Sequence, residues 1–191
     1  MNSEKRWLER SGLMAALVEK APGHTLGRTA VMKLAYFLQV LKDVPLGYDF
    51  RLHTFGPFDS DVLDDLAYAE VFGAVKEKVV TQSQGYRYEI KPGKRSAQVQ
   101  QESESWLGQH RQAIDWTIQE FGNLTAAELE LLSTIVFADR ENHKEGKKVS
   151  LDELAKQVQA IKPRFPQPHV LRECRRALEK GFLLAVSHSE Q

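Results

Sequence analysis

The chain has 191 residues, enough for one large domain or two small ones, and 42% of them are hydrophobic, which is ordinary for a protein with a buried core. Twenty-six Lys and Arg balance 26 Asp and Glu, which excludes a strong overall attraction to nucleic acid or to a membrane. Cys174 is the single cysteine, and no signal peptide or uncharged stretch of roughly 18 apolar residues is evident. We therefore expect a cytoplasmic protein that does not enter a membrane.

Two helices come first in the predicted chain order. Helical spacing of apolar residues predicts the first at about residues 5–21, and Pro22 with Gly23 ends it because neither residue extends a helix. The same spacing predicts the second helix at about residues 28–42. Either Thr25 or Thr29 is expected to cap it.

A strand, a tight corner and a third helix follow. Alternating apolar residues over 50–54 predict the strand, and Gly56 with Pro57 interrupts it. The third helix is expected to begin at Asp59 or Ser60 and to end near residue 73. A helix, a strand and a helix thus meet around one Gly-Pro corner.

A β-hairpin completes the first half of the chain. Alternation over residues 74–81 and 86–91, joined by the polar residues 82–85, predicts its two strands. Helix, helix, strand, helix and hairpin is the element order of a winged helix-turn-helix. The polar residues 95–121 are then expected to form one helix that connects the two halves.

The pattern of the C-terminal part predicts three helices that pack like a helix-turn-helix. Thr125 with Glu128, and Ser150 with Glu153, form the pattern of a capping box, and residues 187–191 look disordered. The predicted fold is therefore mainly α with a small β-hairpin, an α+β class. Its expected parts are a winged-helix-like domain at 1–94, a connector helix at 95–122 and a small helical unit, similar to a helix-turn-helix, at 123–191.

One set of short motifs resembles a known family. Lys33-Leu34 and Tyr36-Phe37 on one helix, followed by Gly56-Pro57 before an acidic helix, resemble the Panacea antitoxin domain of SocA-like proteins and its YwgA-like relatives, over about residues 13–91. The chain has G-P-F where G-P-V is commoner, which favours the YwgA-like branch. The resemblance implies a mainly helical antitoxin module that neutralises a toxin by direct contact or by delivery for proteolysis, with some members in phage or defence loci.

The third helix favours protein over DNA as a partner. Residues 59–70 hold five acids and no base, and each carboxylate would repel a phosphate. The alternatives are that these acids only favour the helix N-terminus and solubility, or that they form a metal site. Asp61 and Asp65 are expected to face solvent. The candidate contact surface comprises the corner and its neighbours: Tyr36, Phe55, Gly56, Pro57, Phe58, Asp61, Asp65 and Tyr68.

The C-terminal part carries the alternative function, a transcription regulator that binds DNA. Residues 144–180 hold ten bases and five acids, a local excess of five positive charges. Arg172, Arg175 and Arg176 share one helix face, and His169 lies near the start of the same helix, as in a helix that reads a groove. The other interpretation of these residues is a solvated face or a contact with an acidic protein.

Enzymatic interpretations have little support in the sequence. The six histidines and one cysteine lack metal-ligand spacing, and no phosphate-binding loop is present, so no metal or cofactor is expected. His53 with Asp59 and Ser60 leaves an acid–base pair open. A small pocket formed by Lys33, Tyr36 and Tyr48 is an alternative to simple packing. We expect a non-enzymatic interaction protein.

Overall fold

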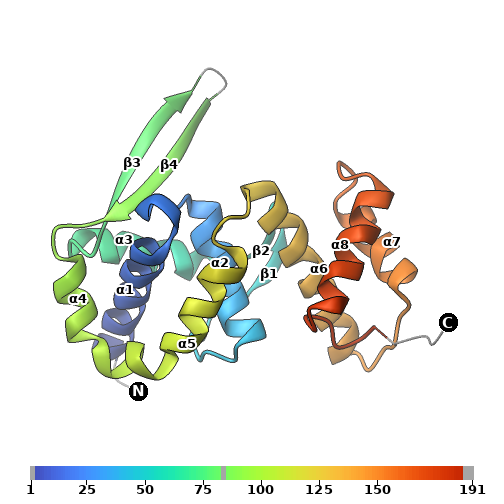
Figure 1. The fold of residues 1–191 in the computed structure, drawn as a ribbon, viewed down its shortest axis with the longest axis horizontal. Coiled ribbons are helices and arrows are strands. Elements are labelled where there is room, and N and C mark those ends of the chain that lie inside the picture. Colours follow the sequence, from blue (N-terminus) through green and yellow to red (C-terminus); the bar gives the residue numbers. More distant parts are fainter. Residues whose placement is uncertain (1–2, 83–84, 187–191) are drawn as a thin grey trace. The chain divides into compact units, whose positions relative to one another are not determined.

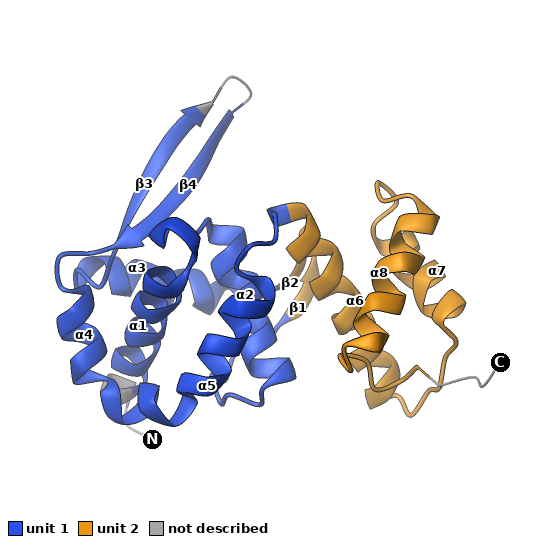
Figure 2. Ribbon diagram, viewed as in Figure 1, with its two compact units in different colours: residues 1–50, 58–126 blue, residues 51–57, 127–191 orange. Residues whose placement is uncertain are grey.

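The computed structural model describes residues 3–82 and 85–186, which form a mainly helical α+β fold (Figure 1). The predicted α+β class is therefore confirmed. Residues 187–191, predicted to be disordered, lie outside the described residues. The chain divides into two compact units, and residues 51–57 belong to the second although they lie between two elements of the first (Figure 2).

Unit 1 comprises Met1–Phe50 and Phe58–Ala126. Its elements are α1 (Ser3–Lys20), the short 3-10 helix η1 (Pro22–His24), α2 (Arg28–Leu41), α3 (Ser60–Val71), β3 (Val75–Gln82), β4 (Gly85–Pro92), α4 (Ser96–Glu102) and α5 (Glu104–Phe121).

Unit 2 comprises Arg51–Pro57 and Ala127–Gln191. Its elements are β1 (Arg51–His53), β2 (Gly56–Phe58, whose last residue is counted in unit 1), α6 (Ala126–Lys144, whose first residue is counted in unit 1), α7 (Leu151–Ile161) and α8 (Gln167–Glu179).

Local capping contacts explain most of the helix starts. The third helix begins at Ser60, one of the two predicted starts, and Asp59 caps it by accepting a hydrogen bond from the Asp61 N–H at 2.9 Å. The capping box of Ser150 and Glu153 is confirmed at α7, whereas that of Thr125 and Glu128 stays a prediction. At α2 the N-cap is Gly27, which has no side chain to accept a hydrogen bond, so the predicted Thr25 or Thr29 cap is wrong.

The helix predicted over residues 95–121 is two helices, α4 and α5, which meet at Ser103. The Ser103 hydroxyl donates to the Val99 carbonyl, and a Cβ on Gly12 of α1 would overlap that hydroxyl. Both helices pack against α1, and α5 also packs against α2. They are thus part of the core of unit 1, where Phe37 stacks on Phe121 with ring centres 4.1 Å apart.

The hairpin β3–β4 is antiparallel and extends away from the helices of unit 1 (Figure 1). At its base, Leu26 and Ile90 exchange backbone hydrogen bonds of 3.0 and 2.8 Å. The segment between α1 and α2 therefore pairs with β4 through one antiparallel bridge. Residues 83–84, part of the predicted turn, lie outside the described residues.

Each unit contains fully buried apolar side chains. In unit 1 the fully buried side chains lie mainly on α1 and α2, and they include Leu13, Leu17, Leu34 and Leu38. In unit 2 they include Ile135, Val136, Leu154, Val158, Val170 and Cys174. No single helix within residues 3–82 and 85–186 is long and apolar enough to cross a membrane.

Candidate functional site

The Gly56-Pro57 corner is buried in unit 2. Gly56 has a φ of +87°, which favours glycine, and a Cβ there would lie 3.0 Å from Thr134 Oγ1 and 3.1 Å from Ser133 Oγ. Both hydroxyls belong to α6. The corner therefore packs closely against α6, and its backbone is not open to a partner.

A buried ion pair holds the same turn. Lys162, at the end of α7, donates a hydrogen bond to the Thr54 carbonyl, and its Nζ lies 3.0 Å from Glu130 Oε1. Both side chains are only 4% exposed. Arg164 adds a second contact, 2.7 Å from Glu130 Oε2. Lys162 is thus a structural cation and does not contribute to the basic surface expected in this part of the chain.

A second buried polar network lies in unit 1. Arg10 of α1 pairs with Asp65 of α3 at 2.7 Å and donates to the Leu46 carbonyl, while the Tyr48 hydroxyl donates to Asp65 at 2.9 Å. The Arg10 guanidinium also lies over the Tyr48 ring, 4.2 Å from its centre.

Burial dominates the protonation of this network. It raises the pKa of Tyr48, so the phenol stays a hydrogen-bond donor. Burial also raises the pKa of Asp65, and the nearby Arg10 and the Tyr48 hydroxyl oppose that rise. The prediction that Asp65 faces solvent is therefore wrong, since the side chain joins α1, α3 and the loop before β1.

The solvent face of α3 carries two apolar side chains beside two acids. Tyr68 and Val71 are 56% and 79% exposed, and Asp61 and Asp64 are also exposed. These four residues follow each other at intervals of three or four, so they form one helix face. We call these four residues the α3 face.

The predicted contact surface is therefore correct only in part. Phe55, Asp61 and Tyr68 are exposed, and Phe58 is half-buried. Tyr36 is 2% exposed and packs edge-on against Phe50, with ring centres 5.1 Å apart. Buried against other elements, four of the eight predicted residues cannot form a contact surface: Tyr36, Gly56, Pro57 and Asp65. The exposed residues are also divided, since Phe55 belongs to unit 2 and Asp61 with Tyr68 to unit 1.

The basic residues predicted on α8 do share an exposed face. Arg172, Arg175 and Arg176 are all exposed, and His169 Nδ1 lies 3.2 Å from Arg172 Nη2. Glu173 pairs with Arg172 at 3.4 Å and with Arg176 at 3.9 Å. Arg175 forms no ion pair within the described part of the chain, so a cation is available there.

Residues that the sequence left open for an acid–base pair or a small pocket bind the backbone or are buried. Asp59, considered beside His53 and Ser60, uses both carboxylate oxygens to accept from the Asp61 and Asp49 N–H groups. Lys33, Tyr36 and Tyr48 are at most 5% exposed. Burial raises the pKa of the Cys174 thiol to about 12, which makes it a poor nucleophile at neutral pH.

Metal-ligand clustering is absent from the region that the structure describes, where no three His, Cys, Asp or Glu side chains gather.

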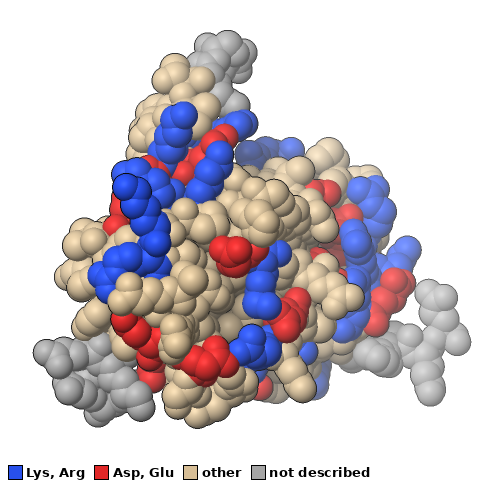
Figure 3. Space-filling view, turned by 60° about the vertical axis from the view of Figure 1, so that its left-hand side comes forward, with Lys and Arg blue, Asp and Glu red and all other residues tan. Residues whose placement is uncertain are grey.

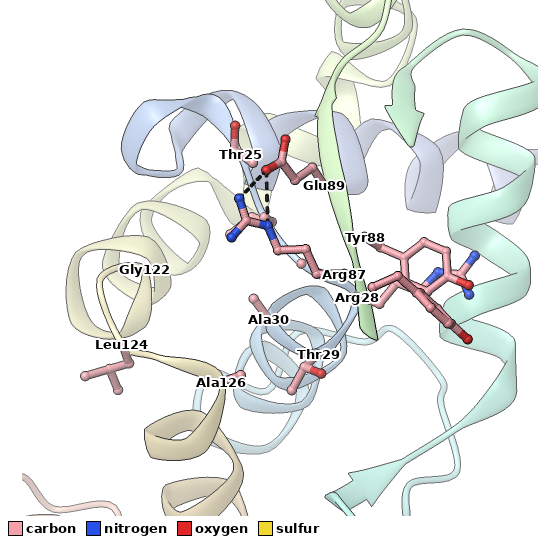
Figure 4. Close-up of a pocket in the computed structure, with 13 residues that line it drawn as sticks. Thr25, Arg28, Thr29, Ala30, Arg87, Tyr88, Glu89, Gly122, Leu124 and Ala126 are labelled. Carbon is pink, nitrogen blue, oxygen red and sulfur yellow. Dashed lines mark hydrogen bonds and ion pairs between the residues drawn. The ribbon is translucent and has the colours of Figure 1, made fainter. Parts of the chain in front are cut away.

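A cavity of about 520 Å³ lies beside β4 in unit 1 (Figure 4). It is lined by the start of α2, by β4 and by the chain between α5 and α6, including Thr25, Ala30, Arg87, Glu89, Leu124 and Ala126. Arg87 and Glu89 pair at 2.7 Å, so their charges cancel at its rim. Sequence reasoning missed this cavity because its lining comes from three distant segments.

No family model matches the chain, and no curated protein matches it.

Proposed function

We propose that the chain is a non-enzymatic interaction protein of antitoxin or defence-associated type, which binds a protein partner in the cytoplasm. The motifs of Lys33-Leu34, Tyr36-Phe37 and Gly56-Pro57 support a Panacea or YwgA-like relationship, which rests on these motifs alone. The bridge of Leu26 with Ile90 supports a winged-helix-like topology for unit 1, since it joins the segment between α1 and α2 to the hairpin.

The exposed α3 face is the observation that carries this proposal. Tyr68 and Val71 expose apolar surface that a soluble protein gains by covering, and Asp61 with Asp64 gives the same face a negative rim. The helix beneath is fixed by the Asp59 cap and by the buried pair of Asp65 with Arg10. A rigid face loses little conformational freedom on binding.

The complementary partner surface has basic side chains around an apolar centre. Opposite charge at the rim of an interface steers association, while the central apolar side chains supply most of the affinity. The proposed partner is therefore a toxin, or another defence component, whose docking surface is basic at its edge.

Antitoxins of the type that the chain resembles are often encoded beside their toxin, so co-expression with the product of the neighbouring gene tests the proposal. If that product inhibits growth, the chain should restore growth and co-purify with it, and Asp61→Lys with Asp64→Lys or Tyr68→Ala with Val71→Ala should abolish both effects. Glu104→Lys with Asp115→Lys on α5 is a matched control, because these two acids are also exposed. Neutralisation that survives both α3 variants would reject the α3 face as the contact surface.

A second candidate function is DNA binding through α8. The observation that favours it is the common exposure of Arg172, Arg175 and Arg176 on a helix whose other face packs into unit 2 through Val170, Cys174 and Ala177. We propose that α6, α7 and α8 form a helix-turn-helix-like unit in this case. Alanine at all three arginines should weaken binding to duplex DNA, and Lys156→Ala, an exposed cation on α7, provides the control.

A further inference from the structure

The hairpin β3–β4 has two chemically different faces. Its register places Lys76 opposite Lys91, Lys78 opposite Glu89 and Val80 opposite Arg87, and directly opposite residues share a face. These six residues form what we call the basic face. The other face carries Val79 opposite Tyr88 and Thr81 opposite Tyr86, with Tyr86 67% exposed.

Positive charge prevails on the basic face. Its four cations are exposed, and the one acid, Glu89, pairs with Arg87 at 2.7 Å and Lys91 at 3.5 Å. Glu70 of α3 pairs with Lys76 at the root, at 3.2 Å. Lys78 forms no ion pair within residues 3–82 and 85–186. Figure 3 shows Lys and Arg side chains gathered on the hairpin and around its base.

The arrangement is not explained by the stability of the hairpin itself. Lys76 and Lys91 stand directly opposite each other, and like charges at such a position destabilise a strand pair. Glu70 and Glu89 lower that cost without removing the positive excess. A bound polyanion would neutralise the remaining positive charge.

The base of the hairpin is rigid. Arg28 of α2 makes two hydrogen bonds of 2.7 and 2.6 Å to Glu77, and its guanidinium lies 3.6 Å from the centre of the Tyr88 ring. Figure 4 shows Arg28 beside Tyr88 on one side of β4 and Arg87 beside Glu89 on the other. The hairpin is therefore held through Glu77 and Tyr88 on one face, while the four cations of the basic face stay exposed, with Arg87 at the edge of the cavity beside β4.

We propose that the basic face of β3–β4 binds the phosphate backbone of duplex DNA. A two-stranded ribbon fits the major groove, and eight-residue strands span about 26 Å, long enough to follow it. Single-stranded nucleic acid fits less well, because it requires aromatic and basic groups on the same side. Here the exposed Tyr86 lies on the opposite face from the cations. This inference does not rest on the function proposed for α3.

Fluorescence anisotropy with a labelled duplex of about 20 base pairs tests the proposal, at salt from about 50 to 200 mM. The parent chain carries Arg172→Ala, Arg175→Ala and Arg176→Ala, so that α8 does not contribute. The hairpin variant adds Lys78→Gln, Arg87→Gln and Lys91→Gln. The matched control adds Lys20→Gln, Arg111→Gln and Lys156→Gln, which removes the same charge from exposed positions outside the hairpin.

We expect the hairpin variant to bind at least about 10-fold more weakly than the parent, and the slope of log K against log salt to fall by about 0.9 for each phosphate that the hairpin no longer neutralises. The control should bind as the parent does, and circular dichroism should show the same fold for all three. Equal weakening in the hairpin variant and the control, or no binding by the parent at low salt, would overturn the proposal. Binding of single-stranded DNA, or of poly-glutamate at equal charge, more tightly than the duplex would overturn the proposal as well.

Discussion

Each unit holds one end of the chain between α2 and α3 with a buried cation. In unit 1, Arg10 donates to the Leu46 carbonyl and pairs with Asp65. In unit 2, Lys162 donates to the Thr54 carbonyl and pairs with Glu130. Both clusters use the same arrangement, in which a carboxylate on a helix neutralises a cation that binds a loop carbonyl. Two buried, oppositely charged side chains in each unit therefore contact this connection.

The two clusters differ in their balance of charge. Asp65 faces one cation and one neutral hydroxyl, that of Tyr48, whereas Glu130 faces two cations, Lys162 and Arg164. Removing the carboxylate in unit 2 leaves two neighbouring positive charges, one of them buried. Loss of Glu130 should therefore destabilise the protein more than loss of Asp65, although neither acid belongs to the proposed contact surfaces.

The largest effect is expected from Glu130→Gln, which leaves buried Lys162 without its charge partner. Breaking a buried ion pair in this way costs about 3–5 kcal/mol. Urea denaturation of the variant measures the destabilisation. A second measurement is the reaction of Cys174 with a thiol reagent at about pH 8, because its burial and raised pKa restrict reaction to molecules in which unit 2 has opened.

A double variant provides the control for Glu130. Glu130→Leu with Lys162→Met replaces the pair by apolar groups and should recover most of the stability, since such replacements are often neutral. If Glu130→Gln unfolds at the wild-type urea concentration and its Cys174 reacts at the wild-type rate, the pair does not hold unit 2 together.

Asp65→Ala is expected to have the next largest effect, a destabilisation of about 2–4 kcal/mol, because Arg10 and the Tyr48 hydroxyl lose their shared acceptor. Asp61→Ala, four residues earlier on the same helix but exposed, should change stability by less than about 0.5 kcal/mol. Thermal and urea unfolding of the two variants measure this difference. Equal effects would show that the buried network in unit 1 adds no stability.

Asp65 and Glu130 also show what the sequence could and could not predict. Asp65 lies among Val62, Leu66 and Ala69, which form the buried side of α3. This spacing is a signal for burial that was available in the sequence, although the total charge of the helix favoured solvent. Glu130 has no such signal, because α6 buries residues around most of its circumference.

Locally determined features were predicted better than those that depend on tertiary contacts. The helix starts at Asp59 and Ser150 follow from side chains a few residues away, and the exposed arginines of α8 follow from helical spacing. The break at Ser103 and the membership of residues 51–57 in unit 2 depend on segments distant in the chain.

Gly56→Ala is expected to lower the free energy of unfolding by about 2 kcal/mol. The backbone at φ +87° strains any residue with a Cβ by about 1–2 kcal/mol, and the new Cβ meets the hydroxyls of Ser133 and Thr134. Gly146→Ala is the matched control, because Gly146 also has a positive φ but has open space around it. Equal shifts in melting temperature for the two variants would show that the contact with α6 has no energetic effect.

The smallest effect on stability is expected from Asp61→Lys with Asp64→Lys. Both side chains face solvent, so the free energy of unfolding should change by at most about 0.5 kcal/mol, and part of that reflects the removal of a negative charge from the first turn of α3. The sequence alone would select Asp61 and Asp65 for this test. Asp64 is mutated in place of Asp65, because reversal of the buried Asp65 would unfold unit 1 and conceal any effect on binding. Differential scanning fluorimetry measures stability and co-purification measures partner binding. If this variant is destabilised as much as Asp65→Ala, the acids of the α3 face stabilise unit 1. If it stays folded and still binds, the acids of the α3 face have no part in recognition.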